Sequence, residues 1–198
     1  MEILSCVPCL RRLRRGSVIG TCIGLSIAVV AANSLAGPPV QSFDEYQVKA
    51  AFLYNFAKFV QWPPESFRSA AESITICVMG LDPFGHFLED TVAGRAIDGR
   101  SLIVRHISSV KQVTGCHIVF IGSAESKRSP LTPAEIAAPG VLTIGESDTS
   151  GAAGAIINFR LDGEKVRLDV NVDAADRAKL RISSRLLSLA HIVEGKGK

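Results

Sequence analysis

The sequence lacks the excess of one charge that nucleic-acid-binding proteins carry. It holds 22 Lys and Arg against 19 Asp and Glu, a formal net charge of +3. Four of the arginines and one glutamate lie in the first 36 residues, so the remainder carries 18 basic and 18 acidic residues. A chain with this balance offers no general electrostatic attraction for nucleic acid, and we expect no such partner.

Metal-binding and catalytic motifs are also scarce. His86, His106, His117 and His191 are scattered, with no pair at i,i+4 spacing, and no Cys-x-x-Cys follows the first 36 residues. His106 and His117 lie in strand-like runs and are expected to be structural. The segment GESDTSG (145–151) has threonine where a nucleophile elbow needs glycine, and the adjoining glycines lack the lysine of a phosphate-binding loop. We therefore expect no catalytic residue, no metal and no cofactor.

The first 36 residues have the pattern of an export signal. Four arginines between positions 11 and 15 precede an apolar run over 17–32, and Ser34 and Ala36 place small residues before a cleavage position at Gly37. The run is shorter than the roughly 20 residues of a membrane-spanning helix, which disfavours the alternative of an uncleaved anchor. We expect 1–36 to be a cleaved signal peptide and 37–198 to form one exported domain.

Few cysteines remain after that segment. Cys6, Cys9 and Cys22 lie within it, which leaves Cys77 and Cys116. An even pair in an exported chain predicts one disulfide, and two separate buried thiols are the alternative. Closing a loop of about 40 residues would contribute roughly 4 kcal/mol in the chain-entropy model.

Strand and helix patterns alternate through the middle of the chain. Apolar runs over 73–80, 101–107, 117–122 and 140–145 predict strands, and helices are expected over 84–92 and 132–138, with a helical turn over 109–113. Asp162-Gly163 between two alternating runs, 154–161 and 165–172, predicts a hairpin. The fold class is α/β: a single domain with a mixed, mostly parallel sheet, helices on both faces, and a C-terminal β-hairpin plus helix.

The expected C-terminal helix covers 173–193. Arg177, Arg181 and Arg185 recur every four residues and would form a basic stripe on it. Such a stripe is commonly a solvated face, and the alternative is a contact surface for an acidic partner or an anionic ligand. Asn171 or Asp173 is expected to cap this helix.

A helix rich in apolar and aromatic residues is expected over 45–61, ending at Trp62-Pro63-Pro64. Its apolar arc is about 200°, twice the minimum stripe of a surface helix. One sector is expected to pack on the sheet; it consists of Val48, Phe52, Phe56 and Phe59.

The second apolar sector of that helix holds Leu53, Ala57 and Val60, and we expect it to meet either the C-terminal helix or another chain. Tyr54 and Trp62 border the sectors as candidates for partner contact, with core packing as the alternative for Trp62. Only Lys49 interrupts the arc, and its ammonium is expected to reach water.

Several separated segments resemble the YfiR family of periplasmic proteins. They are VKAAFLYNFAKFVQWP (48–63), ITICVMG (74–80) followed by Asp82-Pro83-Phe84, HIVFIG (117–122), VLTIGES (141–147) and the ending INFRLDGEKVRLDVNVDAADRAKLRISSRLLSLA (157–190). The resemblance covers most of the chain after the leader and keeps the order of the motifs.

This resemblance implies an exported, non-catalytic regulator that forms a homodimer. The implied partners are an inner-membrane diguanylate cyclase (YfiN-like) or a sensor kinase, with an outer-membrane lipoprotein (YfiB-like) acting against the regulator. Cys77 and Cys116 fall where the family carries a structural disulfide. A second cysteine pair of the best understood member is missing from 145–154, so redox control through it does not carry over.

Two other functions are weighed beside regulation by protein binding. One is a periplasmic sensor that binds a small ligand in an apolar pocket between the opening helix and the hairpin. The other is a periplasmic hydrolase, which would rest only on the polar segment 145–154 and ranks last.

Overall fold

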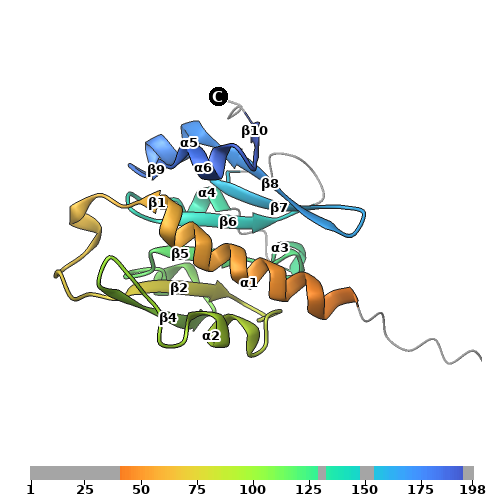
Figure 1. Ribbon diagram of the computed structural model, residues 1–198, viewed down its shortest axis with the longest axis horizontal. Helices are drawn as coiled ribbons and strands as arrows, with labels where there is room; N and C mark the ends of the chain where they lie inside the picture. Colours follow the sequence, from red (N-terminus) through yellow and green to blue (C-terminus); the bar gives the residue numbers. More distant parts are fainter. Residues whose placement is uncertain (1–40, 129–132, 148–153, 194–198) are drawn as a thin grey trace, which may run out of the picture. The chain divides into compact units, whose positions relative to one another are not determined.

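The computed structural model describes residues 41–128, 133–147 and 154–193. Five neighbouring strands are parallel and form the centre of an eight-stranded sheet: β4 (Arg100–Ile107), β2 (Ile74–Met79), β5 (Ile118–Ile121), β6 (Leu142–Glu146) and β7 (Ile157–Asp162). This order reverses direction between β2 and β5, as in doubly wound folds. The predicted α/β class is confirmed (Figure 1).

The two edges of the sheet carry the remaining strands. β3 (Ala96–Ile97) pairs antiparallel with β4 through the turn at Asp98-Gly99. At the other edge β8 (Lys165–Asn171) forms the predicted hairpin with β7, and β10 (His191–Val193) runs parallel to β8. The hairpin is confirmed, whereas β10 is a strand where a helix was expected.

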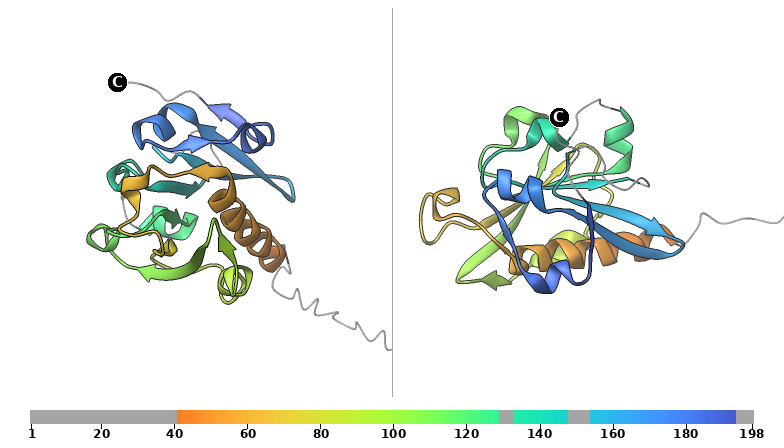
Figure 2. Two further views of the ribbon diagram at one scale, coloured as in Figure 1. Left: turned by 60° about the vertical axis from the view of Figure 1, so that its left-hand side comes forward. Right: turned by 90° about the horizontal axis from the view of Figure 1, so that it is seen from above.

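The sheet separates two apolar layers, because neighbouring side chains of a strand point to opposite faces. In β2, Ile76 and Val78 belong to the larger core, while Cys77 and Met79 belong to the smaller one. Helix α1 (Gln41–Phe59) and α2 (Phe87–Val92) cover the larger core. Helix α4 (Pro133–Ile136) covers the smaller core, and α3 (Ser123–Arg128), which the sequence did not predict, lies on the same side (Figure 2).

A disulfide joins β2 to the segment that leads into β5, within the smaller core. Cys77 of β2 and Cys116, just before β5, form a bond with a Cα–Cα distance of 5.9 Å, and both residues are buried. They are 39 positions apart in the sequence, which matches the loop length used above. The residues before Gln41 and those over 148–153 lie outside the described part of the chain, so the signal peptide stays a prediction.

Helix α1 is packed differently from the prediction. Leu53 is fully buried, and Ala57 and Val60 are almost so; all three lie in the larger core and not at a partner surface. Val48, placed in the sheet-facing sector, is instead 46% exposed. Helix α1 contacts α2 and α6 as well as the sheet, and α6 belongs to the C-terminal segment. Of the two alternatives for the second sector, the structure therefore supports contact with the C-terminal segment.

The end of α1 passes directly into a small second sheet. β1 (Val60–Gln61) pairs antiparallel with β9 (Arg181–Ile182). The half-buried Trp62 packs against the larger core and donates a hydrogen bond from Nε1 to the backbone oxygen of His117, over 3.3 Å. Core packing is therefore the role that the structure gives Trp62.

The expected helix over 173–193 is wrong. The segment instead forms α5 (Val172–Arg177), β9, α6 (Ser184–Leu187) and β10. Lys179 has a φ of 59°, a left-handed conformation that ends α5, and the Ser183 side chain caps α6. The predicted cap of the first helix is confirmed, since Asn171 Oδ1 accepts a hydrogen bond from Ala174 N over 2.9 Å.

Candidate functional site

A buried group of charged side chains joins α1 to the end of β6. The ammonium of Lys49 pairs with the carboxylates of Glu45 and Glu146, and Lys49 is only 1% exposed. Glu146 also accepts a hydrogen bond from Ser123 N over 2.7 Å and one from the Tyr46 hydroxyl over 3.1 Å. The prediction that the Lys49 ammonium reaches water is wrong, because two carboxylates replace its hydration.

The pairing determines how Glu146 titrates. Burial alone would raise the pKa of its carboxyl, but the charge and hydrogen bond of Lys49, with the Ser123 and Tyr46 donors, hold that pKa below its usual value. The pKa of the Tyr46 phenol is raised by its burial and then by the neighbouring Glu146 charge. A charged Glu146 beside a neutral Tyr46 is thus the stable state at neutral pH.

The ion pair of Lys49 and Glu146 lies at the carboxyl ends of β5 and β6, close to the point where the strand order reverses. Doubly wound folds bind their ligands at that position. Here Glu146 ends β6 and Ser123 begins α3, directly after β5. The described residues thus bring an internal ion pair to a place where related architectures recognise small molecules. Of the segment 145–154 considered for a hydrolase, residues 148–153 lie outside the description.

A groove runs between the outer side of α1 and the β7–β8 hairpin, which lie side by side in Figures 1 and 2. We call it the α1–hairpin groove; its volume is about 710 Å³. Its lining residues are Glu45, Val48, Phe52, Leu161, Gly163, Glu164, Lys165, Val166 and Arg167.

The α1–hairpin groove combines apolar surface with a charged rim. Val48 is 46% and Leu161 40% exposed, and Phe52 and Val166 are half-buried. Arg167 is paired with Asp162 over 3.3 Å, whereas Lys165 has no carboxylate partner among the described residues. The groove thus combines apolar surface with side chains of both charges, Glu45 and Glu164 as well as Lys165 and Arg167, which is a composition suited to binding a partly apolar segment or ligand.

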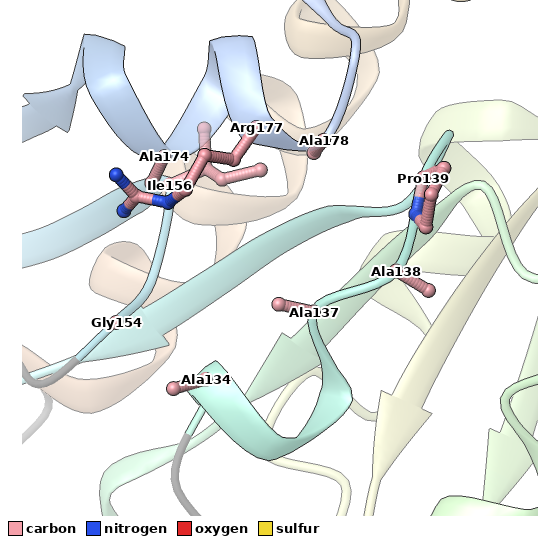
Figure 3. A pocket seen from close by; sticks show the side chains of 9 residues that line it. All are labelled: Ala134, Ala137, Ala138, Pro139, Gly154, Ile156, Ala174, Arg177 and Ala178. Atoms are coloured by element: carbon pink, nitrogen blue, oxygen red, sulfur yellow. The ribbon is translucent and has the colours of Figure 1, made fainter.

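A second, smaller cavity lies between α4, α5 and the start of β7 (Figure 3). Its volume is about 320 Å³, and its lining residues are Ala134, Ala137, Ala138, Pro139, Gly154, Ile156, Ala174, Arg177 and Ala178. Five of them are alanines, and Arg177 supplies the charged group among the lining residues.

The three arginines expected on one stripe lie on different elements. Arg177 is in α5, Arg181 in β9 and Arg185 in α6. Arg181 lines a third hollow, of about 480 Å³, together with Trp62 and Asp176. The basic stripe is therefore a wrong prediction, because the helix that would have carried it does not form.

The aromatic candidate Tyr54 lies between two cations. Its ring centroid is 4.7 Å from the Arg95 guanidinium and 5.6 Å from the Lys58 ammonium. These contacts hold a half-buried ring at the surface, and Tyr54 stays a candidate for partner contact.

The histidines differ in their environments. His117 is structural: its Nδ1 accepts a hydrogen bond from Thr75 N over 3.1 Å, and its ring stacks on Phe67 at 4.4 Å. Burial lowers its pKa. His106 is half-exposed, with Nε2 3.3 Å from Asp82. Within the described ranges, no three His, Cys, Asp or Glu side chains converge in a group that could hold a metal ion.

Comparison with known proteins identifies the family. The model of the YfiR/HmsC-like family matches residues 46–191. The chain belongs to the YfiR/HmsC-like family. No curated protein matches the chain significantly. None of its described helices has both the length and the apolar character needed to cross a membrane. The family is a regulatory, periplasmic one, and its match covers α1 from Tyr46 onward, the cavity beside Arg177, and every lining residue of the α1–hairpin groove except Glu45.

Proposed function

We propose that this protein is a non-catalytic periplasmic regulator that binds the periplasmic part of an inner-membrane diguanylate cyclase (YfiN-like) and represses it. Membership of the YfiR/HmsC-like family supports the class of function. The observation that carries the binding role is the α1–hairpin groove, with exposed Val48 and Leu161 near Lys165, which has no carboxylate partner within the described ranges.

We assign the groove to a segment of the cyclase that carries apolar side chains and a carboxylate. A segment of the cyclase would place apolar side chains against Val48 and Leu161 and a carboxylate against Lys165. Burying the two apolar side chains would supply most of the affinity, and the charge pair would fix the orientation. The proposal extends to a sensor kinase as the regulated enzyme if its periplasmic part carries a segment of this chemistry.

Affinity capture tests the proposal. The protein is coupled to beads and incubated with detergent extracts of the native membranes, and the retained proteins are identified by mass spectrometry. We expect a diguanylate cyclase or sensor kinase with a periplasmic part to be retained, and deletion of the gene to raise cyclic-di-GMP. Recovery of neither enzyme, with unchanged cyclic-di-GMP in the deletion strain, would contradict the proposal.

A second candidate function is a small-ligand sensor that uses the same groove. Its volume lies within the range of ligand pockets, and it combines apolar walls with few polar groups. A ligand present at 100 times its dissociation constant would add about 2.7 kcal/mol to the free energy of unfolding. Thermal-shift screening against periplasmic metabolites tests this, and the absence of any stabilising compound would reject it.

Homodimer formation and an opposing YfiB-like outer-membrane lipoprotein also belong to the proposal. Both derive from the family resemblance, and each has its own measurement. Sedimentation equilibrium would show a dimer, and a strictly monomeric protein at micromolar concentration would reject that part. Crosslinking in cells would recover the lipoprotein, and its absence would leave the cyclase proposal intact while rejecting this partner.

A further inference from the structure

The guanidinium of Arg105 contacts one of the two sulfurs of the disulfide. Arg105 is in β4, directly opposite Cys77 of the neighbouring strand β2. Its Nη2 nevertheless lies 2.9 Å from Sγ of Cys116. The same nitrogen donates to the backbone oxygens of Gln112 and Thr114, over 3.0 and 2.9 Å. The two carbonyls therefore hold the guanidinium against the sulfur of Cys116.

The charge of Arg105 is not balanced by a nearby anion. Within the described ranges it pairs with no carboxylate, and its Nε–H is buried without an acceptor. A half-buried cation in this state costs free energy, because it has lost part of its hydration and gained no counter-charge. The side chains of the smaller core around the two sulfurs are apolar. Reduction of the disulfide would supply the missing anion, as a thiolate beside the guanidinium.

The two cysteines differ in their capacity to form that thiolate. An adjacent cation favours the thiolate, whereas burial among apolar side chains favours the thiol. Cys77 is fully buried within β2, which has strands on both sides. Cys116 follows Thr114 and Gly115, which are exposed, at the end of the loop before β5. Cys116 thus combines the cation with a short path to solvent, as reactive cysteines do.

We propose that Cys116 is the reactive thiolate of the reduced protein and the site at which low-molecular-weight disulfides modify it. Arg105 is the positioning residue that stabilises this thiolate. The inference concerns the smaller core, on the opposite face of the sheet from the larger core, and it does not depend on the proposed cyclase binding.

The reaction with oxidised glutathione shows the chemistry. The Cys116 thiolate attacks one sulfur of the reagent, the bond between the two glutathione sulfurs breaks, and one glutathione leaves as a thiolate with the electron pair. Cys77 then loses its proton, attacks the Cys116 sulfur and releases the second glutathione. The protein disulfide is formed, and two electrons and two protons are transferred to the two glutathione molecules.

Ultraviolet absorption of the thiolate, followed against pH, tests the assignment. Cys77→Ala leaves Cys116 as the thiol of the domain, and Cys116→Ala leaves Cys77. Both proteins are purified from the periplasm and kept in sucrose, which favours the folded state, and circular dichroism verifies folding. Arg105→Met and Arg105→Lys are then added to Cys77→Ala. Lys111→Met is the matched control, because Lys111 is an exposed cation in the same loop as Cys116.

We expect Cys116 to ionise about one pH unit or more below the free-cysteine value of about 8.5, and Cys77 to ionise above that value. R105M should raise the Cys116 midpoint by about one pH unit or more, and K111M should not change it. R105K should restore most of the shift, since it keeps the charge and changes the shape. The proposal is overturned if Cys116 ionises no more readily than Cys77, or if R105M and K111M give the same midpoint.

Trapping with oxidised glutathione needs no substitution at either cysteine. The parent is reduced, freed of reductant, treated briefly with the reagent, quenched with acid, and digested for mass spectrometry. We expect the mixed disulfide on Cys116 to exceed that on Cys77 about tenfold, because the thiolate is the reacting form. R105M should remove most of this excess. Equal or greater modification of Cys77 in the parent would overturn the inference.

Discussion

Lys49 of α1 pairs inside the protein with Glu146, the last residue of β6, across 97 positions of sequence. The pair fixes the first half of α1 against the carboxyl end of the sheet. Because the outer side of the same half-helix forms one wall of the α1–hairpin groove, the buried pair positions the surface to which we assign partner binding.

Removing one member of this pair should strongly destabilise the protein. Lys49→Met leaves the Glu146 carboxylate buried without its cation, and breaking a buried pair in this way costs about 3–5 kcal/mol. Urea denaturation followed by circular dichroism measures the change. Arg68→Met, which removes an exposed partner of Glu72, is the matched control and should leave the midpoint unchanged. A K49M midpoint equal to that of the parent would show that the pair does not hold α1.

The same pair predicts a dependence of stability on pH. The folded pKa of Glu146 lies below its unfolded value, so its contribution is fully present above the unfolded pKa and is lost as pH falls through the folded pKa. The buried His117, with its own lowered pKa, also weakens the fold in acid. The difference in the free energy of unfolding between the parent and the Glu146→Gln variant isolates the contribution of Glu146. We expect this difference to be largest at neutral pH and to shrink below about pH 4.5; a difference independent of pH would contradict the assignment.

The disulfide should contribute substantially to stability. Replacing Cys77 and Cys116 by serine opens a loop of 39 residues, which the chain-entropy model equates with about 4 kcal/mol. The free energy of unfolding should fall by roughly that amount. A reducing agent should lower the stability of the parent and leave the double variant unchanged. Equal sensitivity of both proteins to the reducing agent would show that the bond is absent in solution.

The strands of the central sheet could be predicted from sequence because burial on both faces leaves a local signal. All six residues of β2, ITICVM, are buried, and such a continuous apolar run differs from an amphipathic helix. The hairpin was predictable for a similar reason, since Asp162-Gly163 separates two alternating runs.

The C-terminal segment could not be predicted because distant residues determine its structure. Its residues have helical periodicity, but Ile182 pairs with Val60 and His191 with Asp169, and these strand pairings replace the local preference. The Lys49–Glu146 pair was missed for the same reason. The available signal was a single charge, Lys49, inside an otherwise apolar arc.

Leu53 and Val48 lie on neighbouring faces of α1 but differ in burial, so an aspartate should destabilise the protein at one position and not at the other. Leu53 is fully buried, so Leu53→Asp places a charge in the core and should cost more than about 4 kcal/mol, enough to unfold much of the protein. Val48 is exposed, and Val48→Asp should change the free energy of unfolding by less than about 0.5 kcal/mol. Thermal denaturation of both variants measures this. A folded L53D protein of unchanged stability would contradict the burial of Leu53 in the larger core.

Cyclic-di-GMP in a complemented deletion strain tests the central claim most directly. The strain carries the parent gene, Val48→Asp in the α1–hairpin groove, or Ile103→Asp, a control on β4 with 47% exposure, nearly that of Val48. Periplasmic protein levels are matched by immunoblot. We predict that the parent and I103D restore low cyclic-di-GMP, whereas V48D leaves it at the level of the deletion strain. Full repression by V48D, with I103D also active, would contradict partner binding through the groove.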